Sequence, residues 1–442
     1  MLIATGAAIT VRYSRYDDSD VRRTELFFER SKNSYPKLIA FLHKMPKGGD
    51  LHNHPSGALD AEDVIALAIE QGLYYDRDAE RFTKELPSRD YWAPGDYFDP
   101  RYTQVNPAYS DVLNALSQRD VGSDNFAAST QGENVSGHDD FFRVFNAVGD
   151  VDIPLELELR RLFERASGEN IGYMELMDTP ASAEDLAKYD KLRDEIAPGL
   201  RYNFIATVVR TVDLERFKKM LDDAVAKYYD KDLRVVGITI LAPEDNPISR
   251  RDFDAQMQAI DELYQKSVEE HPDDPPKFSL HSGELTLKLS PYMDMTDRIS
   301  ESIYRGHSIR IDHGASIQWE NDVYGLLRRM KDEHIGVTVC LTSNQGILNY
   351  DAFTSQFRIY YDAGVTVSLS TDDEGVSRTN LTAEYAKAVT DFGLSYADIK
   401  GLAYNAIDIA LLDEDAKSAE RSKLDVAFDE FEAKITEASK IF

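Results

Sequence analysis

The sequence predicts an α/β protein, and within that class a closed (β/α)8 barrel of the TIM type. Short segments rich in β-branched residues recur eight times along the 442 residues, each followed by a helical pattern. Most of them start about 30 residues after the previous one, the length of a strand with its crossover helix. Several are almost continuously apolar, as in residues 235–241, which is typical of parallel strands buried on both faces. Eight such units favour the barrel over an open, doubly wound sheet, which is the structural alternative.

The expected strands follow one another along the chain at residues 49–54, 172–177, 202–209, 234–241, 278–283, 308–313, 336–341 and 365–371. The last of them is the least regular, because Val365, Val367 and Leu369 alternate with polar residues. We expect all eight to pair in one parallel sheet.

The chain is expected to form a single barrel domain over residues 1–442, with additions at both ends. A helical extension within residues 1–45 precedes the first strand, with its helix at about residues 20–43. A packing helix is expected over residues 416–442, where apolar residues recur at helical spacing.

An unusually long connection separates the first and second strands. Its middle, residues 74–138, is rich in Tyr, Asp, Pro, Ser and Gly, and includes Tyr91, Trp92, Tyr97 and Phe98. We interpret it as an insertion with a few short helices over one end of the barrel. Two interpretations of its role stay open: a lid that shapes a substrate pocket, or a surface excursion without a function.

Charge and cysteine content exclude several classes of function. The chain has 50 basic and 79 acidic residues, so its net charge is −29. A field of this sign repels phosphate backbones and anionic lipids, so neither nucleic acid nor a membrane is an expected partner. The one cysteine, Cys340, excludes a disulfide framework and a multi-thiolate metal site, and we expect it to be a buried apolar filler.

No apolar run in the sequence is long enough to cross a bilayer. Residues 1–10 are apolar but lack the basic residues of a signal peptide. We therefore expect a cytoplasmic protein, with export as the alternative if the natural N-terminus is longer. The oligomeric state is left open by the sequence.

The first expected strand ends with two histidines, His52 and His54. Residues two apart on a strand point to the same face, so both imidazoles project to the same side. Paired imidazoles are a natural beginning for a site that binds zinc. Taken alone, two histidines this close in sequence are more often incidental.

Further ionisable residues stand at the ends of three other expected strands: His281 with Glu284, His313, and Asp372 with Asp373. The carboxyl ends of barrel strands meet at the face where active sites lie. Burying this many ionisable groups requires a compensating charge, and a metal ion supplies one. The sequence therefore predicts a metal-dependent active site at this face.

The residue types also indicate a mechanism. Three imidazoles and one carboxylate could hold zinc and leave a position for water: His52, His54, His281 and Asp372. Such an ion lowers the pKa of the water and produces hydroxide near neutral pH. His313 could orient this nucleophile and accept its proton, Glu284 could serve as the general acid, and Asp373 could anchor a substrate nitrogen. The alternative for Asp372 and Asp373 is a pair that caps the following helix.

These motifs resemble the adenosine deaminase family, including its growth-factor-like branch, over about residues 46–407. They occur in family order, each at an expected strand end: Met45-Pro46-Lys47-Gly48-Gly49-Asp50-Leu51-His52-Asn53-His54, His281-Ser282-Gly283-Glu284, Arg310-Ile311-Asp312-His313-Gly314, Thr342-Ser343-Asn344 and Ser370-Thr371-Asp372-Asp373. The resemblance implies a (β/α)8 barrel with one zinc ion. It also implies hydrolytic deamination at C6 of adenosine or a related adenine nucleoside, giving an inosine-type product and ammonia.

The resemblance implies a role for each residue of these motifs. The zinc ligands would be His52, His54, His281 and Asp372. Glu284 would shuttle protons, His313 would orient the hydroxide, and Asp373 would anchor a ring nitrogen.

Two positions depart from the family pattern. Ser56-Gly57 stands where the family usually has an Asp-Gly pair whose carboxylate meets the ribose. Pro243 follows Leu241-Ala242 where a glycine N–H usually meets a purine nitrogen, and proline has no N–H. Adenosine is therefore the leading substrate, and a modified or phosphorylated adenine nucleoside or another aminated ring is the alternative. The main basic residue at a strand end that could meet a phosphate is Arg210.

Two other functions compete with this interpretation. One is a zinc amidohydrolase that cleaves an amide, lactone or phosphoester. Such barrels commonly bridge two metals with a lysine on strand four, and residues 234–241 contain none. The other is a growth-factor-like protein without turnover. Buried histidines and carboxylates that had no catalytic role would destabilise the fold, so the complete set of them argues against this function.

Overall fold

A computed structural model of the chain describes residues 18–88, 91–92, 107–119 and 137–439. Its central element is an eight-stranded parallel sheet whose strands lie side by side in chain order. The strands are β1 (Gly49–Asn53), β5 (Tyr173–Leu176), β6 (Arg201–Val209), β7 (Val235–Leu241), β8 (Phe278–Ser282), β9 (Ser308–His313), β10 (Gly336–Val339) and β11 (Val367–Leu369). Each of the eight predicted segments overlaps one of these strands.

The sheet closes on itself between its first and last strands. Asn53 and Asp372 form a parallel bridge. The N–H of Asp372 donates to the carbonyl of His52 (2.9 Å), and the N–H of His54 donates to the carbonyl of Asp372 (3.2 Å). Because these bonds join the carboxyl ends of β1 and β11, the sheet is a nearly closed barrel. The prediction of a (β/α)8 barrel is confirmed, and the chain does not form the open sheet.

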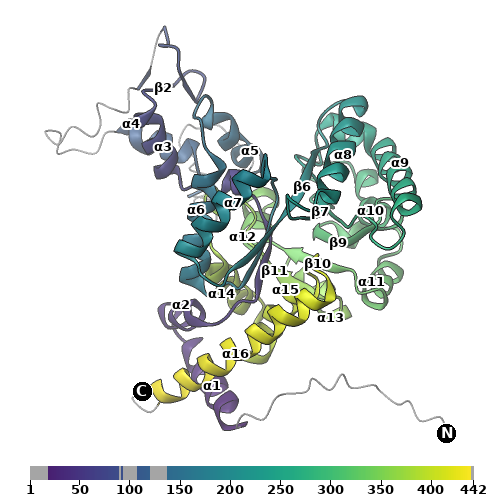
Figure 1. Cartoon of the computed structure of the whole chain (residues 1–442). Helices are drawn as coiled ribbons and strands as arrows, with labels where there is room; N and C mark the ends of the chain where they lie inside the picture. The colour runs from purple at the N-terminus through teal and green to yellow at the C-terminus, as the bar shows by residue number, and fades with distance from the viewer. Residues whose placement is uncertain (1–17, 89–90, 93–106, 120–136, 440–442) are drawn as a thin grey trace, which may run out of the picture.

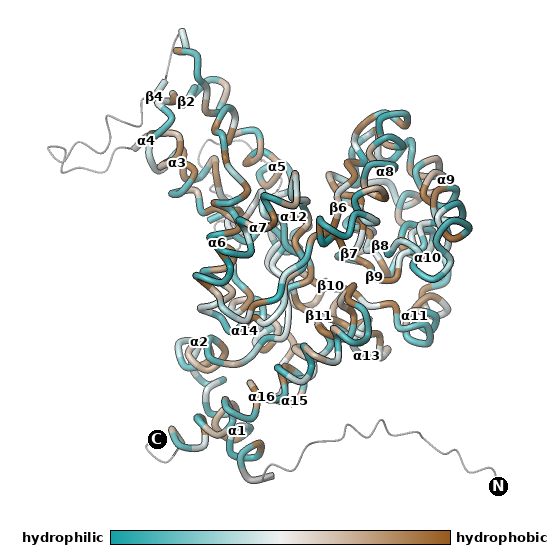
Figure 2. Tube along the Cα trace, viewed as in Figure 1, coloured by the Kyte–Doolittle hydropathy of each residue, from teal (hydrophilic) through white to brown (hydrophobic). Residues whose placement is uncertain are grey.

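Helices that connect the strands or follow the last of them surround the barrel (Figure 1). They are α6 (Leu155–Glu169), α7 (Ala183–Ile196), α8 (Leu214–Tyr229), α9 (Pro247–Glu270), α10 (Arg298–Tyr304), α11 (Val323–Asp332), α12 (Leu341–Leu348), α13 (Phe357–Ala363), α14 (Leu381–Phe392) and α15 (Tyr396–Asp408). Side chains of Ser182, Asp213 and Asn246 accept a backbone N–H and so begin α7, α8 and α9. Hydrophilic and hydrophobic residues alternate along the outer helices in Figure 2, and the main apolar core lies between helices and strands.

Polar side chains fill part of the barrel interior beneath the strand ends. Arg310 on β9 is fully buried, and its guanidinium donates to Glu175 Oε2 (2.6 Å), Ser279 Oγ (2.8 Å) and the carbonyl of Leu51 (3.0 Å). Ser279 in turn donates to Asp312 Oδ2 (2.8 Å). Since these buried charges have partners, the layer supports the strand ends without an unmatched ion.

Three helices lie at the ends of the described chain: α1 (Asp18–Ser31), α2 (Tyr35–Lys44) and α16 (Glu414–Ala438). The single helix expected over residues 20–43 is divided in two. Pro36 lies in the first turn of α2, where it is tolerated, and its ring would break a continuous helix. Phe41 of α2 lies against Phe28 of α1 and Phe431 of α16, with ring centroids 5.1 and 5.2 Å apart. In the described part of the chain, no helix combines the length and apolar character needed to span a bilayer.

The segment after β1 contains α3 (Ala61–Glu70), β2 (Tyr74–Asp76), β3 (Arg81–Thr83), β4 (Tyr91–Trp92), α4 (Pro107–Ala115) and α5 (Gly137–Val148). The strand β2 pairs antiparallel with β3 and β4, a small sheet that the sequence did not predict. Helix α5 lies against α12 at one end of the barrel. Tyr97 and Phe98 lie outside the described residues. Short 3₁₀ helices follow β1, β8 and β9: η1 (Pro55–Gly57), η3 (Tyr292–Met295) and η4 (Ile317–Trp319).

Candidate active site

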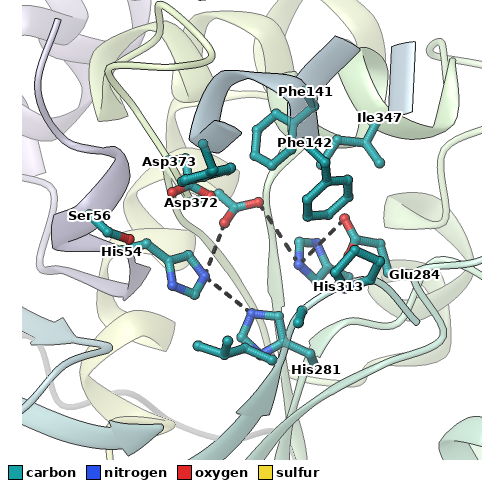
Figure 3. Close-up of a pocket in the computed structure, with 14 residues that line it drawn as sticks. His54, Ser56, Phe141, Phe142, His281, Glu284, His313, Ile347, Asp372 and Asp373 are labelled. Carbon is teal, nitrogen blue, oxygen red and sulfur yellow. Dashed lines mark hydrogen bonds and ion pairs between the residues drawn. The ribbon is translucent and has the colours of Figure 1, made fainter. Parts of the chain in front are cut away.

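A cavity of about 280 Å³ lies at the carboxyl ends of the barrel strands (Figure 3). Its polar lining consists of His54, Ser56, His281, Glu284, His313, Asp372 and Asp373. Its apolar lining consists of Phe141, Phe142, Phe145, Leu241, Ala242, Pro243 and Ile347. The structure therefore brings eight of the ten predicted site residues to one cavity, and the other two, His52 and Gly57, lie against its lining residues.

The four residues predicted as metal ligands bring their donor atoms together. His54 Nε2 lies 3.3 Å from His52 Nε2 and 3.2 Å from His281 Nε2. Asp372 Oδ1 lies 3.4 Å from His52 Nε2 and 3.3 Å from His54 Nε2. Ligand atoms about 2.0 Å from a tetrahedral zinc ion are about 3.3 Å from one another, so this spacing fits zinc. Three imidazoles with one carboxylate are also a donor set that zinc accepts.

Threonines of the barrel interior contact the Nδ1 atoms of two of the imidazoles, on the side away from the proposed metal. Thr338 Oγ1 lies 3.2 Å from His52 Nδ1, and Thr239 Oγ1 lies 3.0 Å from His281 Nδ1. A histidine that binds metal through Nε2 carries its proton on Nδ1, so each threonine oxygen accepts a hydrogen bond from that N–H. Burial lowers the pKa of both histidines, most strongly that of His281, and so favours the neutral form that binds metal.

Asp372 is fixed by its backbone and by its side chain. Three residues after the end of β11, it adopts a φ of +62°, a left-handed conformation that few residues with a Cβ adopt. Ser343 Oγ donates to its Oδ2 (2.6 Å), which leaves Oδ1 facing the imidazoles. Burial alone would raise the pKa of Asp372, but His52 and its neighbouring histidines hold that pKa well below the ordinary value. Asp372 is therefore an ionised ligand candidate.

Glu284 and His313 face each other beside these donors. His313 Nε2 lies 3.8 Å from Glu284 Oε1, and His313 Nδ1 lies 3.3 Å from Asn344 Oδ1. Burial, with Asp372 and Glu244 nearby, raises the pKa of Glu284 to about 8. Its Oε1 is buried without a hydrogen-bond partner among the described residues, so it is available to a substrate.

Asp373 also presents a buried oxygen that has no partner in the described part of the chain, its Oδ1. Burial, together with the charge of Asp372 beside it, raises its pKa well above the ordinary value, which favours the protonated form. Gly57 lies behind it, and a Cβ at Gly57 would overlap this carboxyl group. The alternative of a helix-capping pair is wrong, because α14 begins later and is capped by Asn380.

The two positions that depart from the family pattern both reach the cavity. Ser56 lies in η1, and Pro243 lies in the loop after β7. Ala242, one residue earlier, adopts a φ of +84°, the left-handed conformation that favours glycine. The left-handed backbone at this loop therefore falls on Ala242, and Pro243 offers no N–H to the cavity.

An apolar wall faces these polar groups, and it is not among the features predicted from the sequence. Phe141, Phe142 and Phe145 of α5 and Ile347 of α12 form this wall (Figure 3). The spacing of the three phenylalanines on one helical turn was a signal that could have found it. Neither Lys nor Arg occurs among the described residues that line the cavity. Arg210, the phosphate candidate, is fully buried and donates to backbone carbonyls instead.

The chain matches known proteins over most of its length. The adenosine deaminase family model matches residues 161–427, which is more than half of the chain. An adenosine deaminase of Vibrio vulnificus is 23% identical over 373 residues, which cover 80% of this chain and 92% of that protein. An adenine deaminase of Sinorhizobium medicae is 32% identical over 140 residues, which cover 31% of this chain and 40% of that protein.

Solved structures share the barrel. An amidohydrolase from Burkholderia ambifaria with bound zinc has a TM-score of 0.57 and 21% identity, and the match covers 90% of this chain and 94% of that one. The N6-mAMP deaminase of Arabidopsis has a TM-score of 0.57 and 20% identity, covering 88% of this chain and 99% of that one. The similarity to these two structures agrees with the barrel fold, and the match to the family model shows which family the sequence belongs to. The chain belongs to the adenosine deaminase family and is a hydrolytic deaminase of adenine-type compounds.

Proposed function

We propose that this protein catalyses the zinc-dependent hydrolytic deamination of an uncharged adenine nucleoside, with adenosine as the leading substrate. One observation carries the proposal. Contacts of 3.2–3.4 Å link the donor atoms of His52, His54, His281 and Asp372 into one cluster, and Glu284 and His313 lie beside them at a cavity with one apolar wall.

A single zinc ion is the metal that this donor set favours. Other groupings of candidate ligands nearby also involve His52, His313 or Asp372, so they belong to the same site. When bound, zinc supplies a Lewis acid that lowers the pKa of a water molecule. The absence of a lysine from β7 removes the usual bridging ligand of a two-metal site.

The remaining residues move protons and hold the ring. Glu284, with its pKa raised to about 8, is protonated at neutral pH and donates to the ring nitrogen beside C6. His313 accepts a proton from the attacking water and passes it to the departing amino group, which leaves as ammonia. The remaining hydroxyl proton returns to Glu284, so a C6–O bond replaces the C6–N bond. Asp373 hydrogen-bonds to a second ring nitrogen.

The cavity favours a nucleoside over a nucleotide. A phosphate group needs cations or backbone N–H groups, and the described lining offers three carboxylates and neither Lys nor Arg. The related structure from Arabidopsis is named for a nucleotide substrate, and we propose that this chain differs from it. Ser56 cannot supply the carboxylate that usually meets the ribose, so we expect tolerance of changes at the sugar.

Free adenine is the second candidate substrate. The region similar to the Sinorhizobium adenine deaminase supports it, as does the uncharged Ser56, because a base without a sugar needs no ribose anchor. Adenine and adenosine share the reacting ring, so the same residues would serve both reactions.

The test is ammonia release from adenosine, 2′-deoxyadenosine, 5′-deoxyadenosine, 5′-methylthioadenosine, AMP and adenine, measured on one preparation whose zinc content is known. We expect turnover of the nucleosides with one zinc per chain and a kcat/KM for AMP at least about 100-fold lower. Preference for AMP would contradict the nucleoside proposal, and preference for adenine would support the second candidate. Release of ammonia from none of them would contradict both.

A further inference from the structure

A short turn separates the metal-ligand candidate His281 from the proton donor Glu284. Ser282, the last residue of β8, and Gly283 lie between them, and Gly283 adopts a φ of +74°. A Cβ at Gly283 would lie 2.7 Å from Ser316 Oγ, so the middle of the turn is closely packed. The relative position of the two functional side chains therefore depends on how the two ends of the turn are held.

Arg210 holds the first end of the turn. This residue follows β6, is 1% exposed, and its guanidinium donates to the carbonyl of His281 and to that of Ile240 (3.3 Å). Its own carbonyl accepts a hydrogen bond from Gln256 Nε2 (2.8 Å). These hydrogen bonds hold both the backbone and the guanidinium of Arg210, and they place the guanidinium against the backbone of His281.

Glu244 holds the second end. It follows Pro243 in the loop after β7 and is 3% exposed. Its Oε2 accepts the backbone N–H of Glu284 (2.8 Å), and its Oε1 lies 3.4 Å from Arg210 Nη1. One buried ion pair therefore connects the carbonyl of His281 to the amide of Glu284.

We infer that Glu244 and Arg210 are positioning residues for proton transfer, which fix Glu284 relative to His281 through the backbone of the turn. Neither is among the residues that line the cavity, so they do not act on the substrate directly. The inference rests on the proposed function, because it assigns Glu284 the proton that reaches the ring. A displacement of about 1 Å in a catalytic group can lower turnover by about 100-fold.

The decisive variants are Glu244→Ala and Glu244→Gln. The alanine removes the acceptor for the Glu284 amide, whereas the glutamine keeps a side-chain oxygen that can accept it. We expect Glu244→Ala to lower kcat by about 100-fold with KM changed less than about threefold, and Glu244→Gln to restore kcat to within about tenfold of wild type. Zinc content should stay at the wild-type value in both.

A buried ion pair remote from the cavity supplies the matched control. Lys400 Nζ lies 2.7 Å from Glu432 Oε1, with side-chain exposures of 11% and 5%. Glu432→Ala also breaks a buried pair, so it should lower the melting temperature while leaving kcat unchanged. Equal losses of kcat in Glu244→Ala and Glu432→Ala would mean that the effect is one of stability alone, and would overturn the inference.

Hydrogen exchange of the Glu284 amide gives a readout that does not depend on turnover. In Glu244→Ala this amide loses its acceptor and should exchange at least about tenfold faster than in wild type. If exchange is faster in Glu244→Ala but the wild-type protein deaminates no adenine compound, the contact between Glu244 and the Glu284 amide is confirmed. The proposed function is then contradicted instead. Unchanged exchange, or faster exchange with a wild-type kcat, would overturn the positioning role.

Discussion

His52 and Asp372 contact each other through both their backbones and their side chains. The N–H of Asp372 donates to the carbonyl of His52 (2.9 Å), and the Oδ1 of Asp372 lies 3.4 Å from His52 Nε2. The first contact closes the barrel between β1 and β11, and the second forms one edge of the proposed zinc site. Metal binding and barrel closure therefore depend on the same pair, and we expect zinc to stabilise the fold.

The first prediction concerns the ligand set. His52→Ala, His281→Ala and Asp372→Ala should each lose zinc and activity together, because each removes one of four proposed ligands. Elemental analysis of the purified variants measures this directly. The exposed His271 at the end of α9 offers a matched control, since His271→Ala should keep both zinc and activity. A wild-type zinc content in any of the three ligand variants would show that the ligand set is wrong.

The second prediction separates proton transfer from metal binding. Glu284→Gln keeps the size of the side chain but cannot donate a carboxylic acid proton, so kcat should fall by about 10²- to 10⁴-fold. Zinc content and melting temperature should stay at wild-type values. Steady-state kinetics with adenosine measures the loss, and a kcat within about tenfold of wild type would remove Glu284 from the acid role.

Residue patterns predicted the barrel and the polar half of the site, because both follow from local regularities. The strands could be placed from their apolar runs, and His52 and His54 from the two-residue period that puts them on one face. Asp372 and Asp373 could be placed because they follow the last apolar segment, although their resemblance to a helix cap left an alternative open.

The other half of the site depends on contacts between segments that are distant in sequence. Helical spacing places Phe141 and Phe142 on α5 close to one another, but they reach the cavity only because the insertion returns α5 to the barrel, which their spacing does not show. Glu244 touches the amide of Glu284 across two neighbouring strands. The position of Arg210 next to a strand end suggests a phosphate ligand, but the structure buries it against carbonyl groups.

The third prediction concerns the sugar. Ser56→Asp places a carboxylate where the family usually has one, so it should restore selection for the 5′-hydroxyl. A hydrogen bond of this kind contributes about 1–3 kcal/mol, so we expect the ratio of kcat/KM for adenosine over 5′-deoxyadenosine to rise by about 10- to 100-fold. Ser56→Asn, which adds similar volume without charge, is the control. A wild-type protein that already rejects 5′-deoxyadenosine sharply would contradict the proposed tolerance at the sugar.

The fourth prediction is a pH dependence of stability at the junction between α5 and the loop after β7. His138 Nε2 lies 3.0 Å from Asp245 Oδ1, and the side chains are 11% and 20% exposed. Burial opposes the charged imidazole, but Asp245 outweighs this effect and raises the pKa of His138. A pKa raised on folding gives stability that is complete below the ordinary histidine value and is lost as pH rises through the folded-state value.

Asp245→Asn should therefore lower the melting temperature by about 1–2 °C at pH 6 and have little effect near pH 9. Thermal unfolding of both proteins across this pH range measures the difference. Asp139→Asn is the comparison, because its carboxylate lies 3.2 Å from His138 Nδ1 but its side chain is 70% exposed, so the effect should be smaller. A loss that is equal at all pH values would show that the pair does not titrate in this range.

The central claim is that one zinc ion, held by His52, His54, His281 and Asp372, makes this chain an adenine nucleoside deaminase. Titration of the metal-free protein with zinc, with ammonia release from adenosine as the readout, tests it most directly. We predict that activity rises linearly and stops increasing at one equivalent of zinc per chain, and that Asp372→Ala shows no such rise. A break at two equivalents, or full activity in the metal-free protein, would contradict the claim.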